Sequence, residues 1–304
     1  MKKGRLRRRA LRIVIALTLI ILVGGYIVFQ HIAPYAIIKP ARASCSHLSL
    51  DAYDLQGESL TLETKDQIEL KGYWIQSKQD SIRGVMILVH GIGGCKESFL
   101  SLANRLANQG IASVLFDNRA HGQSGGQYST YGFYEKKDIS RIIDHIKEQD
   151  NQIPIGIWGN SLGGAIAIQS MEYDKRIHFG IIESTFTDMG QIVYDYKKRF
   201  LKGFGLRFAT DMALKRAGEI GDFNPDLVSP VDAVKSIEQP IFIAHGDADL
   251  NIKFAYGQQL YEQAKSADKE FYRVKDGGHY GLFDAGGEDY MLHIQQFIDR
   301  NLLR

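Results

Sequence analysis

The fold of this chain is decided by the stretch Ile155-Gly156-Ile157-Trp158-Gly159-Asn160-Ser161-Leu162-Gly163-Gly164. Its apolar start predicts a buried strand, and the segment 162–173 that follows is typical of a helix. Between strand and helix, residues 159–163 match the pattern Gly-x-Ser-x-Gly. A sharp turn of this kind needs small residues around its serine and lifts the hydroxyl above the sheet. The stretch therefore predicts a nucleophilic Ser161.

Similar short apolar runs recur along the chain and alternate with helical stretches. Strands that are apolar on both faces are typical of a parallel sheet covered by helices. The runs lie at 85–89, 112–116, 155–158, 179–182, 241–244 and 271–274, and the helical stretches lie around 98–109, 135–149, 162–173, 254–266 and 288–302. Alternating residues over 60–64 and 68–76 predict a hairpin before them. We therefore predict one α/β domain over residues 58–304, with a doubly wound, mostly parallel sheet and an antiparallel start.

A serine nucleophile needs a base that takes its proton and a carboxylate that orients the base. Ligands bind beyond the carboxyl ends of parallel strands, so the residues after each run are the candidates. His279 lies in a glycine-flanked loop after the run 271–274, and Asp249 follows the run 241–244. We predict a catalytic triad of Ser161, Asp249 and His279.

The acid of this triad has alternatives in the sequence. Asp247 lies two residues before Asp249, and it is expected to cap the loop while Asp249 reaches the imidazole. Glu183 and Asp188 follow the run 179–182, where a carboxylate could also approach the base. We prefer Asp249 as the acid that reaches the imidazole, and the resulting order Ser161, Asp249, His279 is the chain order of nucleophile, acid and base.

An oxyanion that forms on the substrate needs N–H donors. The N–H of Leu162, directly after the nucleophile, is one expected donor. The second is expected from the glycine-rich loop after the run 85–89, and we assign it to Ile92. Backbone donors need no particular side chain, so both assignments rest on position alone. His90, at the start of this loop, is interpreted as a structural histidine.

The chain begins with a basic segment that is followed by a long uncharged, apolar segment. Seven of the 37 lysines and arginines lie in residues 1–12, and residues 13–29 contain no charged side chain. A helix over 13–29 would be roughly 25 Å long, close to the thickness of a hydrocarbon core. A buried core helix would not need the preceding cations. A cleaved signal peptide is a second alternative, because Ala41-Arg42-Ala43 resembles a cleavage site, but that site lies unusually far from the apolar run.

These features favour an uncleaved signal anchor in the cell membrane. We predict a cytoplasmic segment at 1–12, a transmembrane helix at 13–29, a stalk at 30–57 and a catalytic domain on the extracytoplasmic side. The formal net charge of the chain is +2; without the seven N-terminal cations, 30 positive and 35 negative residues remain, a charge of about −5. This balance argues against a basic nucleic-acid-binding face.

The predicted triad and its surroundings resemble the α/β-hydrolase superfamily of serine hydrolases, over roughly residues 58–304. Residues 117–124 look like the family's D-x-R-G-H-G-x-S loop, with Ala120 in place of the usual glycine and His121 as a scaffold residue. Within the superfamily the chain is similar to membrane-anchored bacterial hydrolases with a short helical lid. The resemblance implies a lid at approximately 184–229.

Four apolar residues in this region recur at every fourth position and predict one helix with an apolar stripe: Phe200, Phe204, Phe208 and Met212. Basic residues accompany them, among them Lys197, Lys198 and Arg199. Packing is the simpler interpretation of the stripe, and contact with anionic headgroups is the alternative. We hypothesise an acyl-ester substrate with an apolar, lipid-like chain.

No cofactor or metal site is predicted, because the Walker A, G-x-G-x-x-G and H-E-x-x-H patterns are missing from the sequence. Cys95 is interpreted as an inert thiol, and a disulfide with Cys45 stays open. The predicted reaction is hydrolysis of a carboxylic ester through an acyl-enzyme. A serine peptidase, a thioesterase or a non-catalytic membrane-tethered scaffold are the alternatives, and a scaffold would be expected to have a broken triad.

Overall fold

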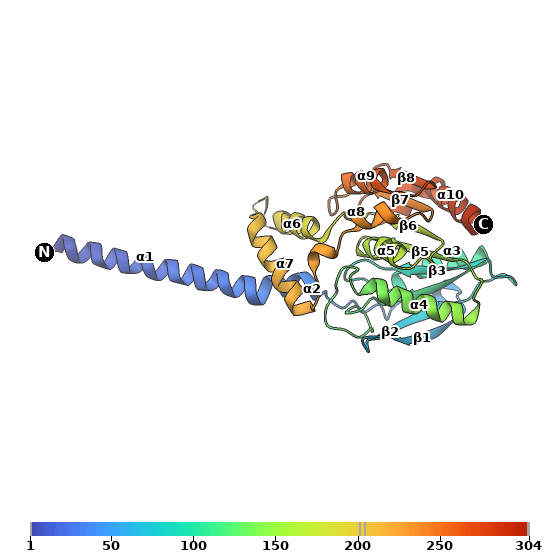
Figure 1. Cartoon of the computed structure of the whole chain (residues 1–304), viewed down its shortest axis with the longest axis horizontal. Helices are drawn as coiled ribbons and strands as arrows, with labels where there is room; N and C mark the ends of the chain where they lie inside the picture. Colours follow the sequence, from blue (N-terminus) through green and yellow to red (C-terminus); the bar gives the residue numbers. More distant parts are fainter. Residues whose placement is uncertain (1, 201, 204, 303–304) are drawn as a thin grey trace.

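A single eight-stranded sheet organises the chain in the order β1-β2-β4-β3-β5-β6-β7-β8. The structure is a computed structural model that describes residues 2–200, 202–203 and 205–302 (Figure 1). The strands are β1 (Gly57–Glu63), β2 (Glu69–Ile75), β3 (Gly84–Val89), β4 (Ile111–Phe116), β5 (Ile155–Asn160), β6 (Phe179–Glu183), β7 (Ile241–Gly246) and β8 (Lys269–Val274). β1 pairs antiparallel with β2, and β2 with β4, while the other neighbours are parallel. The predicted mostly parallel sheet with an antiparallel start is confirmed.

Helices cover both faces of the sheet because the central strands are apolar on both faces. In β3, Val85 and Ile87 belong to one buried cluster, whereas Met86 and Leu88 belong to the other. The first cluster is completed by α4 (Glu135–Gln149), α5 (Leu162–Tyr173), α8 (Pro230–Ala233) and α9 (Phe254–Gln263). The second is completed by α3 (Leu100–Asn108) and α10 (Leu282–Leu302). This alternation follows from the two-residue period of a strand.

The lid region forms two helices, so the prediction of one helix with a continuous stripe is wrong. α6 (Met189–Phe200) ends at Phe200, and α7 (Arg207–Gly221) begins one residue before Phe208. Between them Gly203 has a φ of 97°, which is outside the helical region and is easily adopted only by glycine. Phe200 is 86% exposed and Phe208 73% exposed. Phe204 lies outside the described residues.

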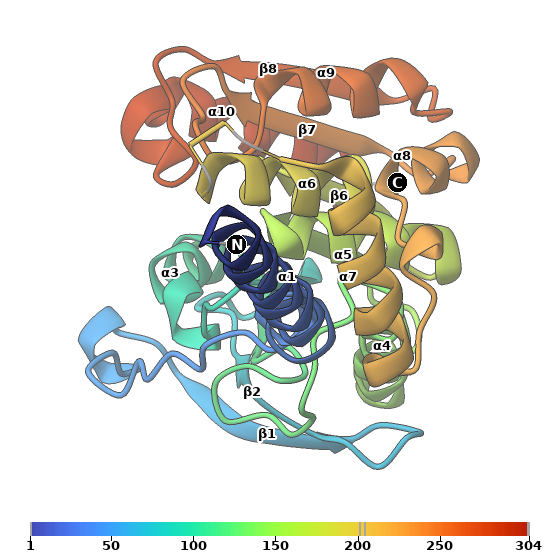
Figure 2. The same ribbon diagram turned by 90° about the vertical axis from the view of Figure 1, so that its left-hand side faces the viewer.

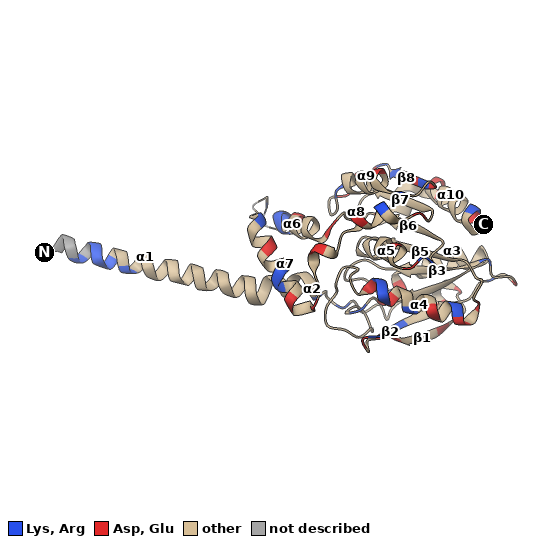
Figure 3. Ribbon diagram, in the orientation of Figure 1, with Lys and Arg blue, Asp and Glu red and all other residues tan. Residues whose placement is uncertain are grey.

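The N-terminal segment is helical over most of its length. α1 (Lys2–Ile27) continues through a π-helical turn (Val28–Ile32) into α2 (Ala33–Ile38). Residues Arg7–Ile38 form the one helical stretch, among the residues described, that is long and apolar enough to cross a membrane; its most apolar 18 residues have a mean hydropathy of 2.5. Figure 3 shows the basic residues at the far end of α1 and no charged residue along the rest of that helix. The apolar stretch thus continues beyond residue 29, where the predicted span ended.

The segment 30–57, predicted as a stalk, is attached to the domain for much of its length. Ile38 is fully buried in the core. The guanidinium of Arg42 donates hydrogen bonds of 2.6–3.1 Å to four carbonyl oxygens in one loop of the domain, those of His121, Gly122, Ser124 and Gly126. Cys45 is joined to Cys95 by a disulfide. The interpretation of Cys95 as an inert thiol is therefore wrong, and the segment is fixed on the domain beside the loop after β3.

The Cys45–Cys95 disulfide closes a loop with a sequence separation of 50 residues. Replacing both cysteines by Ala is expected to lower the free energy of unfolding by about 2–4 kcal/mol, because the open loop gains conformational entropy in the unfolded chain. The measurement is the thermal unfolding midpoint of the full chain in detergent, for the wild type with and without reductant and for the double variant. A midpoint unchanged by the substitutions would contradict this expectation.

Candidate active site

Ser161 lies in a sharp turn between β5 and α5, as the sequence predicted. Its φ and ψ are 54° and −121°, a strained combination for a residue with a side chain. Neither nearby glycine could carry a side chain. A Cβ on Gly163 would lie 1.9 Å from the carbonyl oxygen of Val89, and a Cβ on Gly159 would lie 2.2 Å from the carbonyl oxygen of Gly163. The backbone N–H of Ser161 donates to the carbonyl oxygen of Glu183 at 2.9 Å. The turn is therefore held from both sides.

The structure brings the three predicted triad residues together in one hydrogen-bonded chain. The hydroxyl of Ser161 lies 3.0 Å from Nε2 of His279, and Nδ1 of His279 lies 2.8 Å from Oδ2 of Asp249. Because the carboxylate accepts, we assign the imidazole proton to Nδ1, which leaves the lone pair of Nε2 facing the serine. Ser161 is 5% exposed and His279 8% exposed. This is the arrangement in which a serine can lose its proton to a base.

The carboxylate of Asp249 is buried, and its surroundings keep it ionised. Burial opposes ionisation, but hydrogen bonds from His245, His279 and the N–H of Ile252 outweigh it, so the pKa of Asp249 lies well below its usual value. Oδ1 accepts from the N–H groups of Asn251 at 2.7 Å and Ile252 at 2.9 Å. A charged Asp249 can stabilise the imidazolium that forms when His279 accepts a proton.

His245 is a contact of the candidate acid that the sequence did not reveal. It is the next-to-last residue of β7 and fully buried, and its Nε2 lies 3.0 Å from the carbonyl oxygen of Ile252 and 3.3 Å from Oδ2 of Asp249. Since a carbonyl oxygen only accepts, Nε2 carries the proton and points it at both oxygens. The spacing of four residues between His245 and Asp249 was the available signal, but spacing alone does not say which atoms meet.

The alternative acids all have other partners. Asp247 lies 2.6 Å from Nη2 of Arg273 and accepts from the N–H of Asp276. Glu183 accepts from the hydroxyl of Tyr290, and burial raises its pKa. Asp188 accepts from the N–H of Gln191 at 2.7 Å. The carboxylate that reaches His279 belongs to Asp249.

The loop after β3 passes directly over the serine. A Cβ on Gly91 would lie 3.2 Å from Cβ of Ser161, so the backbone approaches the nucleophile closely. Ile92 and Leu162 line the same cavity as Ser161. Nδ1 of His90 lies 2.7 Å from the carbonyl oxygen of Gly91, and its Nε2 accepts from the N–H of Asn118 at 3.0 Å. His90 thus ties the loop after β3 to the loop after β4; the donor roles of Ile92 and Leu162 stay a prediction.

The loop after β4 is a buried polar scaffold. The carboxylate of Asp117 accepts from the backbone N–H of Lys96 at 2.8 Å and from its Nζ at 3.0 Å. Ala120 has a φ of 64°, a left-handed conformation that explains why glycine is usual at this position. The ring of His121 is fully buried and packs edge-on against His90, with 5.1 Å between the ring centroids.

The two packed histidines make the fold sensitive to acid. Burial, with a contribution from His121, lowers the pKa of His90 from 6.5 to about 4, and burial lowers the pKa of His121 as well. Below about pH 6.5 the unfolded chain binds protons that the folded protein does not, so stability falls as the pH drops. We expect the thermal unfolding midpoint to decline between pH 6.5 and about 5, above the usual range of carboxylate titration. His293, whose side chain is 44% exposed, serves as control: His293→Ala should show the same decline, and a flat wild-type profile would contradict the account.

A cavity of about 880 Å³ opens above Ser161. Most of its lining side chains are apolar, and many come from α6, α7 and the N-terminal segment; examples are Val193 and Phe200 of α6, Ala213 of α7, and Ala36 and Ile37 of α2. The charged lining residues within the described part of the chain are Lys197 and Arg199, both basic. The volume lies within the range of roughly 300–1,000 Å³ that is usual for small-molecule pockets.

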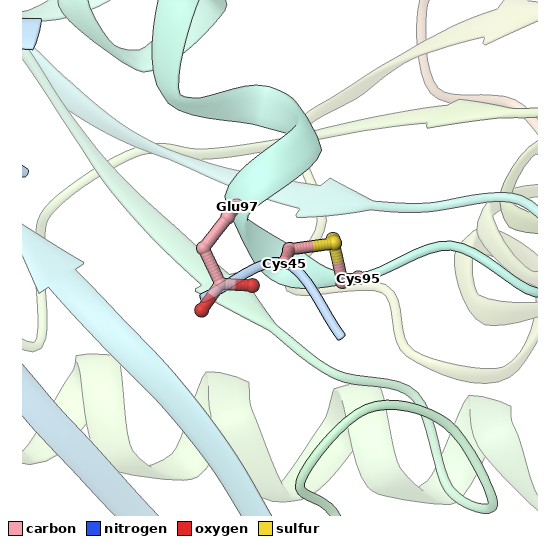
Figure 4. Close-up of side chains that lie close together, drawn as sticks. All are labelled: Cys45, Cys95 and Glu97. Atoms are coloured by element: carbon pink, nitrogen blue, oxygen red, sulfur yellow. A yellow bond between two sulfur atoms is a disulfide. The ribbon is translucent and has the colours of Figure 1, made fainter. Parts of the chain in front are cut away.

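Cys45, Cys95 and Glu97 form a second cluster of reactive groups, shown in Figure 4. The two sulfur atoms are bonded to each other, so neither is a thiolate, the form that binds metals. The carboxylate of Glu97 lies 2.9 Å from Nζ of Lys96. The cluster therefore serves to attach the N-terminal segment to the domain.

The sheet order, the strained serine between strand and helix and the two clusters of covering helices define an α/β-hydrolase fold. Residues 80–219 match the model of a family described as serine aminopeptidase, S33; Asp249 and His279 lie beyond the matched residues. The esterase Pf2001 of Pyrococcus furiosus has a similar structure, with a TM-score of 0.73 and 23% identity over 88% of this chain and 98% of that one. That likeness shows a shared fold.

Two sequence relatives extend the comparison. The protein YqkD of Bacillus subtilis (strain 168) is 27% identical over 236 residues, which cover 76% of this chain and 75% of that protein. The lysophosphatidylserine lipase ABHD12 of Macaca fascicularis is 27% identical over 217 residues, which cover 67% of this chain and 50% of the lipase. This chain has an α/β-hydrolase fold and resembles the serine hydrolases of that superfamily. The matches support a hydrolytic enzyme of the esterase or lipase kind.

Proposed function

We propose that this protein is a serine hydrolase that cleaves carboxylic esters with apolar acyl chains through an acyl-enzyme. The observation that carries the proposal is the hydrogen-bonded chain from Asp249 through His279 to Ser161, with the serine at the floor of an apolar cavity. A non-catalytic scaffold would have no need of a strained serine within reach of a base.

The reaction proceeds in two halves. The Ser161 oxygen attacks the ester carbonyl carbon while its proton passes to Nε2 of His279, and the N–H groups of Ile92 and Leu162 stabilise the oxyanion. The tetrahedral intermediate then collapses: the C–O bond to the alcohol breaks, and the imidazolium gives its proton to the leaving oxygen. Water repeats the same steps on the acyl-enzyme, and the carboxylic acid and free Ser161 are the products.

The charges at the cavity favour an esterase over an aminopeptidase. An aminopeptidase must recognise the α-ammonium group of its substrate, and a carboxylate is the usual partner of a cation. The charged residues that line the cavity in the described part of the chain, Lys197 and Arg199, would repel an ammonium group. The apolar lining suits an acyl chain instead, and one relative is named as a lipase.

We also infer a location in the cell membrane, with the basic N-terminus in the cytoplasm and the catalytic domain outside. The cations before the apolar helix favour this orientation, and disulfides such as Cys45–Cys95 persist mainly in oxidising compartments. Protease added to intact spheroplasts should then degrade the domain or release it from the anchor. Protection of the domain until the cells are lysed would contradict this orientation.

A substrate panel tests the ester proposal. The full chain in detergent would be assayed with p-nitrophenyl esters of increasing acyl length, with aminoacyl p-nitroanilides and with an acyl thioester. We expect kcat/KM to rise about tenfold or more from acetyl to medium and long acyl chains, because each added methylene is buried in the cavity. Faster cleavage of the anilides would favour the peptidase, and faster cleavage of the thioester would favour the thioesterase.

A further inference from the structure

The N-terminal segment supplies one wall of the cavity above Ser161. Residues of the π-helical turn and of α2 that line it are Val28, Phe29, Ala33, Ala36 and Ile37. α6 and α7 supply the facing side, and α7 packs against both the π-helical turn and α2. Figure 2, which looks along α1 toward the domain, shows α6 and α7 beside the N-terminal segment. The cavity is therefore incomplete without the segment that also forms the membrane anchor.

The wall lies where the anchor leaves the bilayer. No Asp, Glu, Lys or Arg occurs from residue 13 to residue 38. About 20 helical residues cross a hydrocarbon core, so a span that begins at residue 13 ends near residue 32. Residues 28–32 then form the last part of the span, and residues 33–37 lie at the membrane surface on the side of the domain. In Figure 1, α6 and α7 lie at the end of the domain from which α1 projects. The cavity thus faces the bilayer surface.

The residues around the cavity suit contact with lipid. Phe200 and Leu206 line it and are strongly exposed, and Phe208 is exposed nearby on α7. Such apolar side chains are unfavourable in water and favourable in a bilayer interface. Nζ of Lys197 donates to the carbonyl oxygen of Leu206, and Arg199 donates to Oδ1 of Asn251. Both acceptors are neutral oxygens, so these hydrogen bonds do not neutralise the positive charges. The two cations can therefore attract an anionic headgroup at the membrane surface.

We propose that the lining residues of this segment, Val28, Phe29, Ala33, Ala36 and Ile37, form a substrate-binding wall as well as part of the anchor, and that the substrate is a bilayer lipid carrying a fatty acyl ester. Its acyl chain passes from the membrane into the cavity between this wall and the helices α6 and α7, and its ester group reaches Ser161. The acyl chain of the lipid therefore never passes through water, where each exposed methylene group is unfavourable. This inference rests on the proposed ester hydrolysis.

Filling the wall tests the proposal in the full chain. Ala36→Trp places a large ring at the lining, whereas Ile32→Trp, at a residue that is 55% exposed and outside the lining, is the matched control. Each variant, reconstituted in phosphatidylcholine and phosphatidylglycerol vesicles, is assayed with a long-chain monoacylglycerol in the bilayer and with soluble p-nitrophenyl acetate. We expect Ala36→Trp to slow monoacylglycerol hydrolysis about tenfold or more and to slow acetate hydrolysis by a clearly smaller factor, because acetate has no long chain to place against the wall; Ile32→Trp should stay close to the wild type on both.

The outcomes separate this inference from the function on which it rests. Unchanged monoacylglycerol hydrolysis by Ala36→Trp, with an active wild type, would overturn the wall while ester hydrolysis stands. A wild type that hydrolyses neither substrate would overturn the ester hydrolysis itself. A readout that needs no turnover uses Ser161→Ala and a diazirine-bearing monoacylglycerol in the same vesicles: adducts within 28–37 and on α6 or α7 support the wall. Adducts confined to residues 13–27 would contradict it.

Discussion

Replacing Ser161 by Ala is expected to lower kcat for ester hydrolysis by about 10⁴- to 10⁶-fold, because the variant has no oxygen that can form the acyl-enzyme. The residual rate would come from oxyanion stabilisation and substrate binding alone. The substitution removes only the hydroxyl oxygen, which lies 3.0 Å from Nε2 of His279. The backbone turn and the His279–Asp249 hydrogen bond do not depend on this oxygen, so the rest of the site should stay in place. The measurement is kcat with the best p-nitrophenyl ester, together with the thermal unfolding midpoint.

A buried serine in β4 provides the matched control for this change. Ser113 is fully buried, and its hydroxyl has no hydrogen-bond partner among the described residues, so Ser113→Ala removes an oxygen without breaking a contact. This variant should keep kcat within about twofold of the wild type. Activity of Ser161→Ala close to that of Ser113→Ala would place the nucleophile elsewhere.

Replacing Asp249 by Asn is expected to lower kcat by about 10⁴-fold at neutral pH. The carboxylate accepts from Nδ1 of His279 and from backbone N–H groups, which fixes the imidazole with its lone pair toward the serine. A neutral amide cannot stabilise the imidazolium, and its NH₂ group can turn the imidazole into the wrong tautomer. The effect should fall on kcat more than on KM, because the interaction strengthens in the transition state.

Asp247→Asn is the control for the acid, since Asp247 was the nearest alternative in the sequence. Its carboxylate is 15% exposed and contacts the 64% exposed Arg273, and the amide oxygen of an asparagine could still accept a hydrogen bond there. We expect kcat of Asp247→Asn within about twofold of the wild type. If Asp247→Asn and Asp249→Asn lost activity equally, the loop conformation rather than the Asp249 carboxylate would be the cause.

The sheet and the serine turn were predictable because their signals are local. Each strand is a short apolar run, and the glycines around Ser161 are required by contacts as close as 1.9 Å. The chain order of nucleophile, acid and base also agreed with a triad of Ser161, Asp249 and His279. The contact between His245 and Asp249 was not predictable, because it depends on how β7 and the following loop fold back on each other.

The errors have equally specific causes. The apolar spacing from Phe200 to Met212 continues across a break at Gly203, so periodicity alone joined two helices into one. The attachment of the N-terminal segment depends on contacts between distant parts of the chain. Arg42 binds carbonyl oxygens about eighty residues away, and the disulfide has a sequence separation of 50. Neither contact leaves a periodic pattern in the sequence.

The most direct test of the central claim, that Ser161 is an activated nucleophile, is labelling of the full chain by a fluorophosphonate followed by mass spectrometry. Such a probe bonds covalently to a serine only when a base activates it. We expect one adduct, on Ser161, that is absent from Ser161→Ala and strongly reduced in His279→Ala. Failure of the folded wild-type protein to react, or an adduct on another residue that persists in Ser161→Ala, would contradict the account.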